Sequence, residues 1–253
     1  MKYYISWSGG KDSTATIILA HLHNIAIDKI VISLPMFDKE RGIYADHPLH
    51  IDWVLNKAIP LFNKWGYKVD IVSSDRDYLY WFYKVRTNKC KNKQYIGKYY
   101  GWLLGGMCKM NEEKTLPIKK YIKELGQEYI CICGIGIEEK PRLERMHLRG
   151  QISLLEQYNY TTDMAKSLCE EYGLLSPLYS MGRHRQGCWF CPNASVKEYA
   201  ELKNNYPELW QELVILSKVQ NTCTKGFKYG ITFEDFATMV DNEINDNQIR
   251  FIE

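Results

Sequence analysis

The residues best suited to chemistry lie directly after the N-terminal apolar stretch, where residues 6–13 read SWSGGKDS. Gly9 and Gly10 let the backbone turn sharply and bring its N–H groups close to an anion, with no Cβ in the way. The apolar spacing that follows predicts a helix, whose N-terminus adds partial positive charge. This segment therefore predicts a loop that holds a phosphate or sulfate group.

Side chains of the same loop extend this chemistry. Ser8 and Ser13 can donate hydroxyl hydrogen bonds, and Lys11 can neutralise phosphate charge. Asp12 would repel a phosphate unless it binds a metal ion or orients a nucleophile or donor. We therefore expect Lys11 and Asp12 to take part in catalysis.

The spacing of the glycines matches neither the G-x-x-x-x-G-K-[ST] loop nor the dinucleotide G-x-G-x-x-G pattern. Instead, SGGKDS resembles the PP-loop of the ATP pyrophosphatases, the adenine nucleotide alpha-hydrolase-like superfamily. The resemblance implies that ATP binds here, with Mg²⁺. The residues it implies for nucleotide binding are Ser6, Ser8, Gly9, Gly10, Lys11, Asp12 and Ser13.

A second candidate segment, GIGIEEKPRLER, runs from Gly134 to Arg145 after a predicted strand. Arg142 and Arg145 are three residues apart and share one face of a helix, which suits a phosphate or sulfate clamp. Exposed ion pairs on a helix surface are the alternative. The segment also resembles one in the PAPS reductase branch of the superfamily, which implies nucleotide contacts from Gly134 and Glu138 and catalytic roles for both arginines.

A third candidate is the Cys-x₂-Cys pair of GCWFCP, Cys188 and Cys191. Two thiolates on one tight turn suit a soft metal, but two ligands do not complete a tetrahedral site. Cys90 or His184 is available as a further ligand. A redox-active dithiol is another alternative, although no strand of the usual kind precedes it.

The segment from Cys108 to Pro117, with Lys114 between them, resembles the cysteine-containing segment of PAPS reductase-like proteins. This resemblance implies a metal site formed by Cys108, Cys188 and Cys191, and a nucleotide contact from Lys114. In sulfur-transferring relatives three cysteines hold a [4Fe–4S] cluster whose open iron carries sulfur. A structural Zn²⁺ site is the alternative.

The remaining cysteines and two histidines carry weaker signals. Cys131 and Cys133 alternate along a predicted strand, so we expect them to face the core. His47 and His50 lie near the end of the loop after the second predicted strand; they could approach a ligand, but we expect them to be ordinary surface residues.

The resemblance implies an enzyme that adenylates an acceptor, releases pyrophosphate and transfers sulfur, as in DNA phosphorothioation sulfur-transfer proteins. Implied partners are ATP, a nucleic-acid or nucleotide acceptor and a sulfur donor such as a cysteine desulfurase. One alternative is a sulfonucleotide (PAPS/APS) reductase. The C-terminal Glu-Cys-Gly motif of those enzymes is absent, since no cysteine follows Cys223. The other alternative is a non-catalytic nucleotide-binding module with a zinc site.

The elements that position these residues alternate between strand and helix over the first part of the chain. We therefore predict an α/β fold with a mostly parallel sheet and helices on both faces. The expected domains are a nucleotide-binding domain over residues 1–150 and a helical part over 151–253. The predicted strands span 2–7, 29–34, 67–73 and 128–133, and the predicted helices lie near 13–23, 50–65, 116–125, 163–172, 196–205, 207–219 and 233–244.

Composition limits the class of protein. The 253 residues are 45% hydrophobic and 25% charged, as in soluble globular proteins, and the start resembles no signal peptide. We expect a cytoplasmic protein without a membrane partner, whose eight cysteines form no disulfide framework. The net charge of +3 does not identify a nucleic-acid partner. The basic stretch 84–98 is either a solvated loop or a surface for a phosphate backbone.

Overall fold

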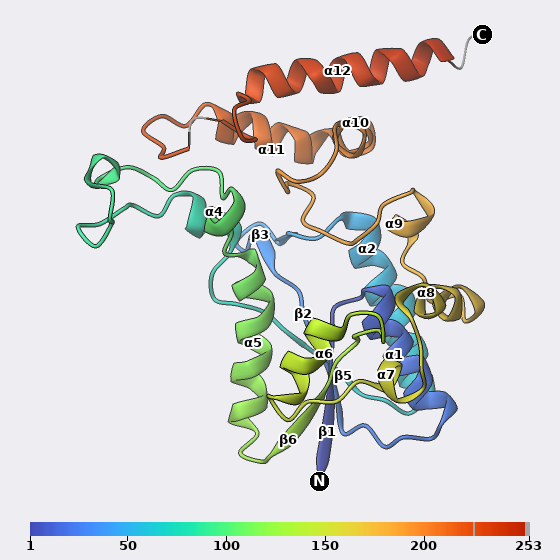
Figure 1. Cartoon of the computed structure of the whole chain (residues 1–253). Helices are drawn as coiled ribbons and strands as arrows, with labels where there is room; N and C mark the ends of the chain where they lie inside the picture. The colour runs from blue at the N-terminus through green and yellow to red at the C-terminus, as the bar shows by residue number, and fades with distance from the viewer. Residues whose placement is uncertain (225, 251–253) are drawn as a thin grey trace. The chain divides into compact units, whose positions relative to one another are not determined.

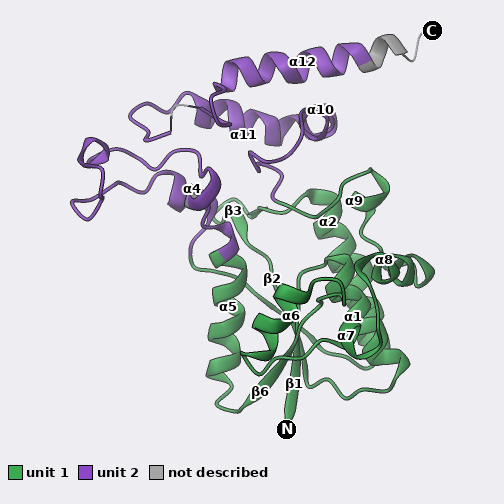
Figure 2. Ribbon diagram, in the orientation of Figure 1, with its two compact units in different colours: residues 1–75, 112–187 green, residues 76–111, 188–253 purple. Residues whose placement is uncertain are grey.

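Figure 1 shows the computed structural model of the chain, which describes residues 1–224 and 226–250 but not the side chains of Met107 and residues 247–250. The chain forms two compact units, each assembled from two separate segments (Figure 2). Unit 1 comprises residues 1–75 and 112–187, and unit 2 comprises residues 76–111 and 188–253. Residue 150, the expected domain boundary, lies inside unit 1.

Unit 1 is built on a four-stranded parallel sheet, as the alternating pattern predicts. Its strands are β1 (Lys2–Trp7), β2 (Lys29–Ser33), β5 (Val69–Val72) and β6 (Tyr129–Ile132), in the order β5-β2-β1-β6. β3 (Met36–Asp38) and β4 (Ile43–Tyr44) form a small separate antiparallel pair. The fold class expected from the sequence is therefore confirmed.

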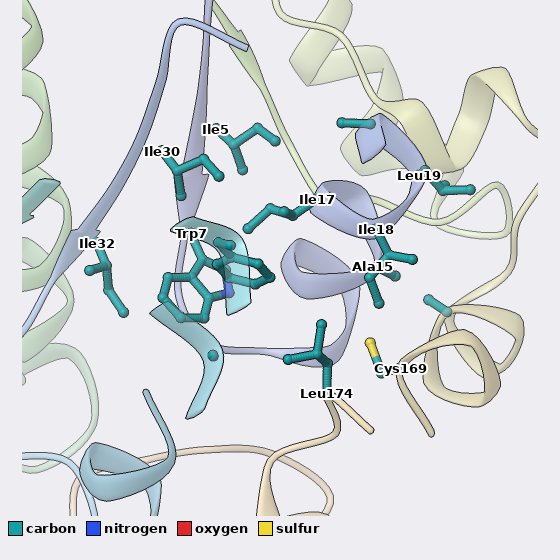
Figure 3. Close-up of a cluster of buried hydrophobic side chains, with 14 of the residues drawn as sticks. Ile5, Trp7, Ala15, Ile17, Ile18, Leu19, Ile30, Ile32, Cys169 and Leu174 are labelled. Atoms are coloured by element: carbon teal, nitrogen blue, oxygen red, sulfur yellow. The ribbon is translucent and has the colours of Figure 1, made fainter. Parts of the chain in front are cut away.

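One face of β1 packs into the main hydrophobic core. Ile5 and Trp7 point into the main hydrophobic core, which Figure 3 shows together with residues of α1 (Lys11–Leu22). This helix is enclosed, since residues 13–20 are all buried. The side chain of Thr14 accepts a hydrogen bond from Trp7 Nε1 at 3.0 Å, so the buried polar groups of the two elements are paired.

A single helix was expected near residues 50–65, and the structure interrupts it. α2 (Pro48–Trp53) passes through a π-helical turn, η1 (Val54–Ala58), into α3 (Ile59–Lys64). Within η1 the N–H of Ile59 donates to the carbonyl of Val54, five residues back. Pro60 has no N–H and its ring would clash with the carbonyl four residues before it, which accounts for a break in the α-helical pattern here.

The chain after the third strand of the sheet supplies further helices to unit 1. These are α5 (Met110–Glu124, whose first two residues belong to unit 2), α6 (Lys140–His147), α7 (Leu154–Gln157), α8 (Thr162–Glu171) and α9 (Pro177–Ser180). α7 and α8 pack on α1. α5 and α6 instead contribute to a pocket on the other face of β1, described below.

Unit 2 is mainly helical. Its elements are α4 (Tyr78–Phe82), the short 3₁₀ turns η2 (Lys93–Tyr95) and η3 (Gly105–Met107), α10 (Val196–Asn205), α11 (Pro207–Ser217) and α12 (Phe233–Arg250). Side chains cap the starts of α10 and α12: Ser195 and Glu198 make a reciprocal capping box, and Thr232 Oγ1 accepts from Asp235 N at 3.1 Å. Aromatic side chains fill its interior, namely Trp102, Tyr199, Trp210, Phe227, Phe233 and Phe236.

Among the described residues, every helix is either too short or too polar to cross a membrane.

Candidate functional site

The glycine pair forms a tight loop between β1 and α1. Gly9 adopts a φ of +73°, in the left-handed region that favours glycine, and Gly10 is the N-cap of α1. A Cβ on Gly9 would lie 2.5 Å from Cε1 of His50 and 2.6 Å from its Nε2. Both the backbone conformation and the close approach of His50 therefore require glycine at position 9.

The two serines of the loop form one hydrogen-bonded group. Ser8 Oγ and Ser13 Oγ are 3.1 Å apart, and Ser13 Oγ also accepts from the N–H of Ser8 at 3.2 Å. The N–H of Gly10 donates to Ser8 Oγ at 3.3 Å. These bonds link the two serines across the turn at the N-terminus of α1.

Gly134, two residues after the end of β6, lies against the same loop. A Cβ at this position would lie 2.5 Å from the carbonyl carbon of Asp12 and 2.6 Å from the N atom of Ser13. Backbone atoms cannot move aside as a flexible side chain can. The chain after β6 therefore approaches the start of α1 this closely only because residue 134 is glycine. The second candidate segment thus meets the first through main-chain contact.

A pocket of about 480 Å³ opens beside the loop on the face of β1 opposite the core. It brings together predicted residues of the first two candidate segments: Ser6, Ser8 and Ser13 with Gly134, Arg142 and Arg145. The other lining residues are Tyr4, Thr115, Ile118, Lys119, Cys131, Cys133, Ile135, Met146, Arg149 and Gln151. Four cationic residues line the pocket, and none of the described lining residues is acidic.

The cations of the pocket differ in their pairing. Arg142 forms an ion pair with Glu139, with Nη1 2.6 Å from Oε1. In the described part of the chain, Lys119, Arg145 and Arg149 have no carboxylate within ion-pair distance. Their uncompensated positive charge beside a loop of hydroxyls and a helix N-terminus suits an anion with several negative charges.

Lys11 and Asp12 lie at the loop but do not line this pocket. Lys11 Nζ is 2.8 Å from Asp12 Oδ1, and the N–H of Lys11 donates to Tyr179 Oη at 3.4 Å. Partial burial raises the pKa of Asp12, and the charge of Lys11 opposes this shift. The pair is thus a separate charged group at the start of α1.

Two other residues expected to contact the nucleotide have protein partners. Glu138 Oε1 accepts from the N–H of Thr162 at 2.8 Å, which caps the first turn of α8. Lys114 Nζ lies 2.6 Å from Oδ1 of Asp46, whose side chain is buried. In the structure, therefore, both side chains make intramolecular contacts that stabilise unit 1.

Several residues at the loop carried no signal in the sequence. Gln186 Nε2 donates to the carbonyl of Gly9 at 2.6 Å, although the two residues are far apart along the chain. The surface position expected for His47 and His50 is wrong, since both are buried. His50 Nδ1 lies 2.9 Å from Ser176 Oγ, and burial lowers the pKa of the imidazole to about 4. The ring under Gly9 is therefore neutral near pH 7.

The three predicted metal ligands all belong to unit 2. Cys108 is exposed, whereas Cys188 and Cys191 are half-buried and share a turn in which Cys191 N donates to Cys188 O at 3.1 Å. All three thiols lie close enough to Tyr78 to add to the rise in its pKa, which burial dominates. Within the described residues, no three or more His, Cys, Asp or Glu side chains are arranged to hold a metal ion.

Comparison with known proteins gives one distant relative to report. No protein-family model matches the chain. The chain is 24% identical over 220 residues to a protein of Methanocaldococcus jannaschii named "Uncharacterized protein MJ0973". The alignment covers 84% of this chain and 47% of the relative, so the chain spans about half the length of the protein it matches. The similarity extends over most of unit 1 and unit 2 without adding a function.

Proposed function

We propose that the chain binds ATP in the pocket beside the Ser6–Ser13 loop and adenylates an acceptor, with sulfur transfer as the following step. An acceptor oxygen attacks the α-phosphorus, the bond to the β-phosphate oxygen breaks, and pyrophosphate leaves. A sulfur nucleophile then displaces AMP from the activated acceptor. The same site would therefore bind a triphosphate, the leaving pyrophosphate and an AMP ester, all of which are anionic.

The observation that carries the proposal is the lining of the pocket. Hydroxyls at positions 6, 8 and 13 share it with three arginines and a lysine, and no described lining residue is acidic. Charge that develops on the phosphates during attack on the α-phosphorus is stabilised most by fixed donors and cations of this kind. The position after the first strand of a parallel sheet supports nucleotide binding as well.

Individual side chains take distinct roles in this proposal. Arg145 and Arg149, which have no carboxylate partner in the described part of the chain, bind phosphate oxygens. Arg142 exchanges its contact with Glu139 for the nucleotide or uses both. Asp12, adjacent to Lys11 at the start of α1, is the residue suited to hold Mg²⁺ on the phosphates.

The cysteines of unit 2 take the sulfur-handling role. Cys108, Cys188 and Cys191 all act electrostatically on Tyr78, and thiolates are the ligands that soft metals and iron–sulfur clusters prefer; their side chains would have to come together around the bound group. Cys108, Cys188 and Cys191 would hold a [4Fe–4S] cluster, which supplies an iron site for sulfur, or a Zn²⁺ ion, which would be structural. A cysteine desulfurase is the class of partner that would supply the sulfur.

A nucleic acid is the acceptor class with support in the sequence. Residues 84–98 contain six lysine and arginine side chains and no carboxylate. Aromatic rings lie beside them in unit 2: Lys84 Nζ is 4.4 Å from the ring centroid of Trp81, and Arg86 Cζ is 3.6 Å from that of Tyr100. Cations interleaved with aromatics suit a phosphate backbone with unstacked bases.

The test uses ATP labelled at the γ-phosphate, Mg²⁺ and the purified chain, with transfer RNA, single-stranded DNA or no acceptor. Adenylation releases labelled pyrophosphate, whereas simple hydrolysis releases labelled phosphate. We expect acceptor-dependent pyrophosphate that Asp12→Asn reduces at least tenfold while ATP still binds. Failure of ATP to bind in a calorimetric titration, or release of phosphate alone, would contradict the proposal.

A further inference from the structure

Two thiols lie side by side in the wall of the anion pocket. Cys131 Sγ and Cys133 Sγ are 3.6 Å apart, and both residues line the pocket. The sequence predicts that both face the core. Both instead line the pocket and neither belongs to the main hydrophobic core; Cys131 is 7% exposed, and Cys133, just after the end of β6, is half-buried. The pair is therefore accessible to a small molecule that enters the pocket.

The surroundings make the two thiols unequal. A hydrogen bond between them lowers the pKa of Cys131 and raises that of Cys133. Cys131 is therefore the thiol that loses its proton first. Tyr4, opposite Cys131 in the register of β1 and β6, also hydrogen-bonds to Cys131. Two thiols of unequal acidity within 3.6 Å suit a two-step oxidation, in which the more acidic thiol reacts first as its thiolate and its neighbour then closes the disulfide.

We propose that Cys131 and Cys133 form a reversible thiol–disulfide pair that hydroperoxides oxidise within the pocket. The Cys131 thiolate attacks one peroxide oxygen, the O–O bond breaks, and a sulfenic acid and hydroxide form. Cys133 then attacks the Cys131 sulfur, the S–O bond breaks, and water leaves. In total two thiols lose two electrons and two protons, and hydrogen peroxide becomes two water molecules, whereas an organic hydroperoxide becomes one alcohol and one water molecule.

The position of the pair links oxidation to the phosphate loop. Gly134 follows Cys133 directly and lies in backbone contact with Asp12 and Ser13. The N–H of Cys133 donates to the carbonyl of Ile152 at 2.8 Å, so this end of β6 is held from both sides. Cα atoms two apart in a strand are about 6.6 Å apart, near the upper limit for a disulfide, so bond formation shifts this backbone and thiols reduce the bond readily.

The inference does not depend on ATP binding, and its test does not use nucleotide. Reduced wild-type protein is treated with graded hydrogen peroxide, alkylated under denaturing conditions and digested with trypsin. Both cysteines fall in one tryptic peptide, residues 124–142, which holds no other cysteine. We expect this peptide to lose two hydrogen atoms, to escape alkylation, and to regain both labels after dithiothreitol.

Cys169 provides the internal comparison, because its buried thiol has a pKa raised to about 12 and should stay reduced. We expect the pair to oxidise at a peroxide concentration at least tenfold lower than Cys169. In Cys133→Ser, a dimedone adduct should appear on Cys131 in place of the disulfide. Full alkylation of both thiols at peroxide levels that oxidise Cys169, or a sulfinic acid on Cys131 in the wild type, would overturn the inference.

Discussion

The Cα of Gly134 and the backbone of Asp12 are in contact, so that a methyl group on Gly134 would lie 2.5 Å from the Asp12 carbonyl carbon. The end of β6 and the start of α1 are thereby fixed against each other. The loop that the sequence singles out is thus shaped in part by a glycine more than a hundred residues away.

Gly134→Ala should therefore disturb the loop more than an ordinary glycine substitution would. Overpacking of a rigid contact costs about 1–3 kcal/mol of unfolding free energy, and the loop must shift to relieve it. We expect a lower urea midpoint together with weaker ATP binding. Gly106→Ala is the matched control, since a Cβ there meets no atom within 4 Å and its φ is not positive. Equal stability of the two variants would show that the contact is not rigid.

Removal of one pocket cation should weaken ATP binding. Lys119 lines the pocket, whereas Lys123, four residues further along α5, does not. A hydrogen bond to a charged group contributes about 1.5–3 kcal/mol, so Lys119→Ala should raise the Kd for ATP about 10- to 100-fold. Lys123→Ala should leave it unchanged in the same calorimetric titration. The same Kd for both variants would place the phosphates away from α5.

The stability of unit 1 should decrease on acidification in a way that His50 controls. The folded protein holds the His50 pKa at about 4, below the ordinary 6.5, because burial disfavours the charged ring. The unfolded chain takes up this proton first, so the contribution is complete above pH 6.5 and is lost as the pH falls towards 4. The loss approaches about 1.4 kcal/mol per pH unit within that window.

His50→Asn cannot titrate in this range and provides the comparison. Urea unfolding between pH 7 and pH 4.5 should give a shallower decrease in stability for the variant, even though it starts from a lower value because the bond to Ser176 is altered. Parallel curves for wild type and variant would mean that His50 is protonated in the folded protein.

The pair formed by Lys114 and Asp46 should stabilise unit 1 mainly by compensating a buried charge. Asp46 is 4% exposed, so Lys114→Met leaves its carboxylate without this partner, a change that costs about 3–5 kcal/mol for buried pairs. Lys114→Met with Asp46→Asn should recover much of the loss. A double-mutant cycle by chemical denaturation measures this coupling, and purely additive effects would argue against it.

The content of iron, zinc and acid-labile sulfide after anaerobic purification tests the cysteines of unit 2. We expect iron and sulfide with visible absorption in the wild type, and their loss in Cys188→Ala. Cys223→Ala is the control, because it is a half-buried cysteine of the same unit outside the predicted set. Colourless protein with one zinc ion would make the site structural and remove its role in sulfur delivery.

How far the sequence predicts this molecule depends on how local each feature is. The strands, the capped helices and the sharp loop at Gly9 follow from residues within a few positions of one another, and the structure contains them. His50, Tyr179 and Gln186 reach the same loop through the tertiary fold, and local periodicity contains no information about such contacts.

The sequence does contain a pattern that indicates one further pocket residue, Arg149, which the prediction missed. Arg149 follows Arg142 and Arg145 at a spacing of three and then four residues, which continues one face of a helix. It lies just beyond the end of α6 and lines the pocket with them. Lys119 had no comparable signal, because its role depends on where α5 packs.

The π-helical turn at Val54–Ala58 sets the rotational phase of the helix on which His50 lies. Each residue of an α-helix advances the side-chain direction by about 100°, and the turn contains one residue more than an α-helical path would need. Deletion of a single residue there would restore the ordinary phase and turn His50 away from the glycine above it. The alignment of the phosphate loop with its supporting histidine thus depends on the number of residues in a turn of which no member lines the pocket.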